Sequence, residues 1–356
     1  MKRLRLDSRE VGGNAPAWII AEIGVNHDGV VERAHELIEH AAAAGADAVK
    51  VQCFHADSLA SPGAQISDYQ RAQGREALDQ RALLSRLELS PEALESLAHA
   101  AAARGLAFLG SPFDLESLEE LLEVGVSAIK IASGEMTNVP LLRRSIASGK
   151  PLLISTGMAS WEEIDRVAAI LGAEEETVPA VFLHCVTRYP TPIDAANVRA
   201  VVRLRERTGS LAGYSDHCRE AEASLAARAL GACVLEKHLT YDSTAVGPDH
   251  ACSLDPREFR EWVQSIRRLE AALGDGEKVH SSLEEEGRRK ARKAIVAARS
   301  LRKGETLSED DLTTRRPAEA GIDAAAWDDV IGRAVGRDLE AGTPICEEDL
   351  LEGEPA

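Results

Sequence analysis

The chain has 356 residues and a formal net charge of −18 at pH 7. This length exceeds one ordinary domain and suits a barrel of roughly 250 residues with a small appendix. The negative charge would repel a polyphosphate backbone, and no basic run with interleaved aromatic residues offsets it, which excludes nucleic acid as a partner.

Cysteine usage and the first residues indicate the compartment. The six cysteines lack paired metal-type spacing, and a chain of this length does not need disulfides to supplement its core. Residues 1–10 alternate in charge and have no apolar core, so we expect neither a signal peptide nor a transmembrane helix. The sequence therefore predicts a cytoplasmic protein without a membrane partner.

From Ala17 to about Leu273, short apolar runs alternate with amphipathic helical stretches, a pattern typical of parallel strands joined by helices. One helix is expected over 31–44 and ends at Gly45. Another begins after Ser90 as its N-cap and runs to about residue 104. Eight strands are expected, and eight units close a (β/α)8 TIM barrel of the α/β class: 18–23, 48–52, 106–109, 128–132, 152–155, 181–184, 211–214 and 233–237.

Three further segments complete the predicted organisation. The long connection 55–89 is typical of a functional loop and should overhang the mouth of the barrel. After the barrel domain, 1–273, a charged linker over 274–293 leads to a small domain over 294–356 built from short strands and turns. In this tail a glycine-containing turn twice precedes an acidic half-turn. So small a core is marginal alone and should pack against a barrel, its own or a neighbour's.

Polar side chains follow most of the expected strands, where barrel enzymes place their chemistry, so the pattern favours an enzyme. His217 and His238 end neighbouring strands, which lie about 4.8 Å apart in a sheet, so their imidazoles can converge on one divalent ion. Two nitrogen ligands favour an open Mn²⁺-like or Mg²⁺-like shell over a closed zinc site. For either histidine alone, the alternative is a hydrogen-bonded loop residue.

Cations and hydroxyls at the strand ends form a donor-rich surface that suits phosphate. Pairing with Glu22, Glu135 and Glu236 is the alternative for the lysines, and turn capping is the alternative for the hydroxyls. Glu22 and Glu135 are also the carboxylates best placed for proton exchange, and Asp249 can face the same cavity or form an Asx turn. The donors are Lys50, Lys130, Lys237, Ser111, Ser133, Ser155, Thr156 and the backbone of Gly157.

Taken together, these segments resemble the sialic acid synthases, a family that includes legionaminic and pseudaminic acid synthases. The tail resembles the antifreeze-like (SAF, β-clip) domain that ends such enzymes, with Thr314-Arg315-Arg316-Pro317 matching its sugar-binding arginine segment. The matching motifs are Ala21-Glu22-Ile23-Gly24-Val25-Asn26-His27, Lys50-Val51-Gln52, Lys130-Ile131-Ala132-Ser133-Gly134-Glu135, Ser155-Thr156-Gly157-Met158, Tyr189-Pro190-Thr191-Pro192, Ser215-Asp216-His217, Glu236-Lys237-His238 and Gly247-Pro248-Asp249.

The resemblance implies roles for individual residues. Glu22 and His238 would be catalytic, and His217 with His238 would bind the metal, Mn²⁺ first and Mg²⁺ or Co²⁺ as alternatives. Arg316 would reach the sugar's acyl group across a domain-swapped homodimer. The phosphoenolpyruvate set would be Lys50, Ser111, Lys130, Ser133, Ser155, Thr187, Ser215 and His238, and the sugar set would be Gln52, Glu135, Tyr189, Asp249 and Arg316.

One departure concerns Thr187, which stands where the family commonly has Asn, so a contact made by that amide is missing or is replaced by the hydroxyl or by Arg188. The implied reaction is that of an N-acetylneuraminate synthase: phosphoenolpyruvate condenses with N-acetylmannosamine, or a related N-acylated hexosamine, and phosphate is released. The alternatives are a legionaminic or pseudaminic acid synthase, a synthase that uses a phosphorylated aldose, and a non-catalytic polysaccharide-assembly protein on the same scaffold.

Overall fold

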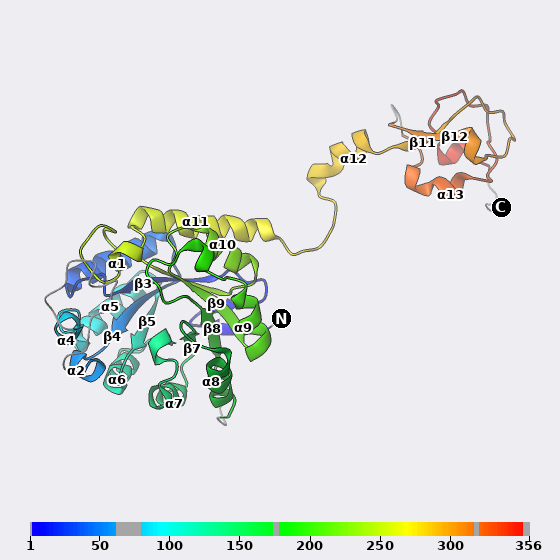
Figure 1. The fold of residues 1–356 in the computed structure, drawn as a ribbon. Coiled ribbons are helices and arrows are strands. Elements are labelled where there is room, and N and C mark those ends of the chain that lie inside the picture. Colours follow the sequence, from blue (N-terminus) through cyan, green and yellow to red (C-terminus); the bar gives the residue numbers. More distant parts are fainter. Residues whose placement is uncertain (1, 62–79, 174–177, 317–319, 352–356) are drawn as a thin grey trace. The chain divides into compact units, whose positions relative to one another are not determined.

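The structure, a computed structural model, describes residues 2–61, 80–173, 178–316 and 320–351. Its contacts divide the chain into two units, Met1–Asp275 and Gly276–Ala356. The first contains a parallel barrel with surrounding helices, and the second contains short strands and turns (Figure 1). Within the described residues, no helix combines the length and the apolar character that a membrane crossing requires.

The first unit is a closed barrel of parallel strands, as predicted. Each strand pairs with its successor along the chain, and β10 returns to pair with β3. This order brings the strand that carries His238 beside the strand that carries Glu22. The Cα atoms of these two residues are partners in the register. The strands are β3 (Trp18–Gly24), β4 (Ala48–Cys53), β5 (Ala107–Pro112), β6 (Ala128–Ile131), β7 (Leu152–Ser155), β8 (Ala180–His184), β9 (Leu211–Asp216) and β10 (Val234–His238).

Helices surround the barrel, and their apolar faces pack on the outward-facing strand residues. Local sequence sets their ends: Ser90 Oγ accepts from the backbone N–H of Ala93 at 3.3 Å, and Gly45 ends the first helix with φ of 87°. These helices are α1 (Val31–Ala44), α5 (Pro91–Ala103), α6 (Leu115–Val124), α7 (Val139–Ala147), α8 (Trp161–Ala173), α9 (Ala200–Thr208), α10 (Glu222–Ala229) and α11 (Pro256–Leu273).

An N-terminal hairpin closes the amino end of the barrel, a feature that the sequence analysis missed. Strands β1 (Leu4–Leu6) and β2 (Arg9–Val11) pair antiparallel. Leu6 and Val11 are buried against Trp18 and the other residues that begin the barrel strands. Arg5 and Glu10 lie on the hairpin's other face, whereas Arg9 stands opposite Leu6 and pairs with buried Asp47. These charges make the segment read as polar in sequence. The hairpin thus covers apolar side chains at the amino ends of the barrel strands.

The described part of the long connection after β4 contains two short helices, α2 (Ala56–Leu59) and α4 (Gln80–Leu84). Leu83 and Leu87 pack with Val25 and Phe54 beside the mouth, in agreement with the expected overhang. The central part of this connection, 62–79, lies outside the described residues.

The loop after β3 buries a histidine that should make stability depend on pH. His27 is fully buried, its Nδ1 accepts from the N–H of Gly29 at 3.0 Å, and burial lowers its pKa from 6.5 to about 4. The unfolded chain binds more protons in this window, so the contribution is complete above about pH 6.5 and is lost as the pH falls toward 4. We expect His27→Gln to reduce the loss of stability between pH 7 and 5 by about 2 kcal/mol. Urea unfolding at both pH values measures the free energy of unfolding. An equal loss of that free energy between pH 7 and 5 in the two proteins would contradict the prediction.

The second unit has its own small core, which includes Ile295, Val335 and Ile345. Its two acidic half-turns share one construction: the carboxylates of Asp311 and Asp349 each cap a 3₁₀ turn and each pair with an arginine twelve residues earlier. The repeated sequence pattern thus corresponds to a repeated structure. The elements are η4 (Ser282–Glu284), α12 (Glu285–Ala291), β11 (Ala294–Ala297), η5 (Glu309–Asp311), β12 (Leu312–Arg315), η6 (Ala324–Ala326), α13 (Trp327–Val330) and η7 (Glu347–Asp349).

Candidate active site

A cavity of about 220 Å³ lies at the carboxyl ends of the barrel strands. Most of the side chains singled out from the sequence meet in it, although they come from eight strands and their following loops. Those that line the cavity are Glu22, Lys50, Gln52, Ser111, Lys130, Ser133, Ser155, Thr187, Tyr189, Ser215, His217, His238 and Asp249.

Two lysines and two carboxylates form a buried charge network on the cavity floor. Lys50 Nζ lies 2.7 Å from Glu22 Oε2 and 3.9 Å from Glu236 Oε2. Lys130 Nζ lies 3.7 Å from Glu236 Oε1. The lysines therefore pair with carboxylates, as the alternative had it for Glu22 and Glu236. All four side chains are nevertheless on the cavity wall, where an anionic ligand can compete for the lysines.

The two carboxyl groups of this network have very different pKa values, because burial dominates at one and the neighbouring cations dominate at the other. Desolvation raises the pKa of Glu22 to about 7, and the negative Glu236 adds to the rise while Lys50 opposes it. Burial would also raise the pKa of Glu236, but Lys130, Lys50 and the hydroxyl of Ser215 outweigh it and hold the pKa at about 2. At neutral pH, Glu236 is a fixed anion and Glu22 can exchange a proton.

His217 and His238 face one another across the cavity wall. Their ring centroids lie 5.5 Å apart, and burial lowers both pKa values, so both imidazoles are neutral at pH 7. His217 Nδ1 donates to the carbonyl oxygen of Val186 at 2.7 Å, which leaves the lone pair on Nε2. His238 Nδ1 is buried without a hydrogen-bond partner among the described residues and lies 3.7 Å from Asp249 Oδ2.

This donor set fits a divalent metal ion. Metal ligation requires neutral imidazoles, and a ligating histidine commonly donates its other N–H to a backbone carbonyl, as His217 does. The nearby carboxyl of Asp249, whose pKa burial raises to about 6, adds an oxygen donor beside His238. Nitrogen and oxygen donors together suit Mn²⁺ and related ions.

The serine hydroxyls have different partners. Lys50 Nζ donates to Ser111 Oγ at 2.9 Å, and Ser215 Oγ donates to Glu236 Oε1 at 2.8 Å. Ser133 Oγ accepts from the N–H of Gly157 at 3.1 Å, so it shapes the loop as well as lining the cavity. Ser155 Oγ is buried and has no hydrogen-bond partner in the described part of the chain. A buried orphan hydroxyl on a cavity wall is available to a ligand.

Thr187 lies against the glycine loop after β7. A Cβ atom placed on Gly157 would lie 2.2 Å from Thr187 Oγ1 and 2.7 Å from Ser133 Oγ, so only glycine lets these two hydroxyls approach that loop. Thr187 therefore lies on the cavity wall beside this loop.

Only some of the residues expected to face the sugar line the cavity. Gln52 Nε2 donates to Glu22 Oε1 at 3.3 Å, and the Tyr189 ring lies 4.3 Å from that of His217. Glu135 is not among the lining residues, and its carboxylate accepts instead from Asn138 Nδ2 at 2.7 Å. Arg316 is exposed and belongs to the second unit, just after β12.

The sequence analysis misplaced one lysine and missed one acid. Lys237 is fully buried and pairs with Asp216 at 2.9 Å, and neither residue lines the cavity. Glu236, considered only as a partner for lysines, is part of the cavity wall. Strand alternation is the signal that separates them: Glu236 and His238 share one face of β10, and Lys237 takes the other.

Comparison with known proteins assigns the family. The NeuB family model matches residues 37–278, more than half of the chain. The chain belongs to the NeuB family. The SAF domain model matches residues 292–351, so this NeuB-family protein carries a SAF domain after its barrel, as the resemblance implied.

Individual relatives of this NeuB-family protein align with 80% or more of it. An N,N′-diacetyllegionaminic acid synthase of Campylobacter jejuni is 42% identical over 92% of this chain and 98% of its own. A protein of the same name from Legionella pneumophila is 38% identical over 95% and 96%. The solved N-acetylneuraminic acid synthetase of Leptospira borgpetersenii has 31% identity and a TM-score of 0.70 over 80% of this chain and 95% of its own.

Proposed function

We propose that this protein condenses phosphoenolpyruvate with an N-acylated amino sugar, giving a nine-carbon 2-keto-3-deoxy acid and phosphate. The observation that carries the proposal is the pair of neutral histidines, His217 and His238, in one cavity with two lysines, in a protein of the NeuB family.

The lysines and hydroxyls support binding of phosphoenolpyruvate. Lys50 and Lys130 supply positive charge in a buried site, where the attraction between opposite charges is stronger than it is in water. Ser155 would gain the hydrogen-bond partner that it lacks. Partial protonation of Glu22 near pH 7 lowers the negative charge beside Lys50, which reduces repulsion of the anionic ligand. Ser111, Ser133, Thr187, Ser215 and His238 complete the proposed set.

His217 and His238 would hold the metal ion, which we propose is Mn²⁺, with Mg²⁺ or Co²⁺ as alternatives. When bound, such an ion acts as a Lewis acid toward a carbonyl oxygen. Asp249 is placed to orient His238, and Val186 fixes the ring of His217 through its carbonyl.

Glu22 is the proposed proton donor. C3 of phosphoenolpyruvate forms a bond to the aldehyde carbon of the open-chain sugar, and the aldehyde oxygen takes up a proton. Water adds at C2, and cleavage of the C–O bond then releases phosphate. A carboxyl group with a pKa near 7 can supply the proton at physiological pH, and Lys50 and Gln52 hold it in place.

The acceptor is the finer part of the proposal. N-acetylmannosamine is the acceptor expected from the sequence, whereas the two legionaminic acid synthases that align over nearly the whole chain favour an acceptor with two acetamido groups. Phosphate release with purified full-length protein, Mn²⁺ and a panel of N-acetylmannosamine, diacetamido hexoses and aldose phosphates separates these possibilities, and product masses identify the acid formed.

The same assay tests the class of protein. No phosphate release with any acceptor, combined with no thermal shift on adding phosphoenolpyruvate and Mn²⁺, would favour a non-catalytic scaffold, since a ligand that binds the native state raises apparent stability. Phosphate release only with an aldose phosphate would mean that the acceptor is a phosphorylated aldose and not an amino sugar.

Arg316 is proposed to reach the acyl group of the sugar in the barrel of a partner subunit. We expect Arg316→Ala to raise the KM for the acceptor about tenfold, the loss of one charge-assisted hydrogen bond, and to leave the KM for phosphoenolpyruvate unchanged. Arg302→Ala, at an exposed position of the same unit outside the matching segment, is the control. Equal acceptor KM values for the two variants would remove Arg316 from the site.

A further inference from the structure

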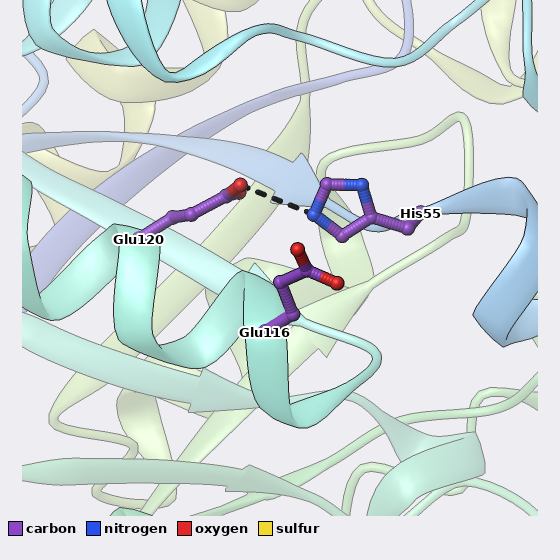
Figure 2. A group of neighbouring side chains, drawn as sticks. All are labelled: His55, Glu116 and Glu120. Carbon is purple, nitrogen blue, oxygen red and sulfur yellow. Dashed lines mark hydrogen bonds and ion pairs between the residues drawn. The ribbon is translucent and has the colours of Figure 1, made fainter.

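A second group of metal-type side chains lies outside the active-site cavity. His55 follows β4, and Glu116 and Glu120 lie on α6. Each offers one ligand atom, and these atoms all lie within 4.8 Å of one another. Figure 2 shows the two glutamates on successive turns of α6 with both side chains directed toward the imidazole. None of the three lines the cavity that contains His217 and His238.

The spacing within this His55 cluster fits ligands that share one ion. His55 Nε2 lies 3.1 Å from Glu120 Oε1. With metal–ligand bonds of about 2.0–2.2 Å, two donors at tetrahedral or octahedral angles lie roughly 2.8–3.6 Å apart. Residues four apart on a helix are neighbours on one face, so Glu116 can complete the set without a change in the backbone.

The charge of the cluster is also incompletely balanced. Among the described residues, neither Glu116 nor Glu120 has a lysine or arginine partner within 4.0 Å. By contrast, Glu119 on the same helix pairs with Arg144 at 2.7 Å. Two carboxylates one turn apart repel each other, and a divalent cation would neutralise both.

Surrounding contacts hold the ligand-bearing groups. The backbone N–H of His55 donates to Asp114 Oδ2 at 3.0 Å, and Cys53 Sγ donates to Glu120 Oε2 at 3.5 Å. These contacts leave His55 Nε2 and Glu120 Oε1 facing each other. Support of this kind, from groups behind the ligands, is what orients donors in protein metal sites.

We propose that His55, Glu116 and Glu120 bind a divalent transition-metal ion such as Zn²⁺ or Mn²⁺, separate from the ion held by His217 and His238. One imidazole and two carboxylates suit such an ion and leave a position for water. The ion ties the connection that begins after β4 to α6, and its role is structural. The proposal does not depend on the proposed catalytic function.

The alternative without metal is an ion pair. Burial lowers the pKa of His55, but Glu120, Asp114 and Glu116 outweigh burial and raise it, which favours a proton on the imidazole when no metal is present. A metal ion displaces that proton, and binding is therefore measured at pH 7.5 and above.

Metal content of the full-length protein tests the proposal. Protein stripped of metal is dialysed against Zn²⁺ or Mn²⁺ and analysed by mass spectrometry, beside the double variant Glu116→Gln, Glu120→Gln. The control is Glu119→Gln, Glu123→Gln, which makes the same charge change at the same spacing on the same helix. We expect the first variant to bind one equivalent less than the parent protein and the control to bind the same amount.

A second measurement separates this site from the catalytic one. In a His217→Ala, His238→Ala background, Zn²⁺ should still raise the melting temperature, and Glu116→Gln with Glu120→Gln should abolish the rise. Crystals soaked in Zn²⁺ should show an anomalous peak among the three side chains. Full metal content in the Glu116→Gln, Glu120→Gln variant, or soaked crystals without that peak, would overturn the proposal whatever the fate of the catalytic site.

Discussion

His238→Ala is expected to lower kcat/KM by at least about 10³-fold, equivalent to about 4 kcal/mol of transition-state stabilisation. His238 carries one of the two neutral imidazoles of the cavity, and its Nδ1 has no hydrogen-bond partner among the described residues. Alanine would remove a proposed metal ligand and a phosphoenolpyruvate contact together. Steady-state kinetics and Mn²⁺ binding on the purified variant measure both losses.

His184→Ala is the matched control for that experiment. His184 also ends a barrel strand and is largely buried, but its Nε2 bonds to the carbonyl of Ala196 at 2.9 Å, and it does not line the cavity. Activity within about threefold of the parent protein is expected, as for residues that touch neither substrate nor metal. Normal turnover by His238→Ala, whatever the activity of His184→Ala, would mean that the catalytic centre lies elsewhere.

Glu22→Gln is expected to reduce kcat by about 10²- to 10⁴-fold, the range for loss of a general acid. Glutamine keeps the size of the side chain and its contact with Gln52, but has no acidic proton to give. Circular dichroism should show the fold unchanged. Glu22→Asp, which keeps the carboxyl group on a shorter stem, should retain more activity than the glutamine variant.

The pH profile identifies the role of Glu22 more sharply. Since the pKa of Glu22 is about 7, the protonated form is present below that pH and is lost above it. A proton donor therefore predicts that kcat/KM falls as the pH rises through about 7, and that the glutamine variant lacks this limb. A limb that persists in Glu22→Gln belongs to another group, and a fall on the acid side instead would make Glu22 a base.

The barrel and much of the cavity follow from short-range sequence patterns. Runs such as 48–52 and 152–155 are apolar, are spaced by helical stretches and end in polar residues, and parallel pairing brings those ends to one mouth. Lys50 and Ser155 were found for this reason. Strand alternation, which places Glu236 and His238 together and sends Lys237 to the opposite face, was the available signal that was not applied.

Other features depend on contacts between distant segments, which no local pattern contains. Glu236 becomes a fixed anion only because Lys130 and Lys50 approach it from other strands. The His55 cluster requires α6 to pack beside the end of β4, and the only hint in sequence is the spacing of Glu116 and Glu120. The N-terminal hairpin was missed because two buried side chains, Leu6 and Val11, do most of its packing.

That hairpin has a practical consequence for protein engineering. Because Leu6 and Val11 seal the base of the barrel, trimming the first dozen residues would admit water to apolar surface far from the chemistry, and lost activity in such a truncation would reflect unfolding. Conversely, substitutions that improve the packing of the N-terminal hairpin can raise the melting temperature without changing any group that contacts substrate.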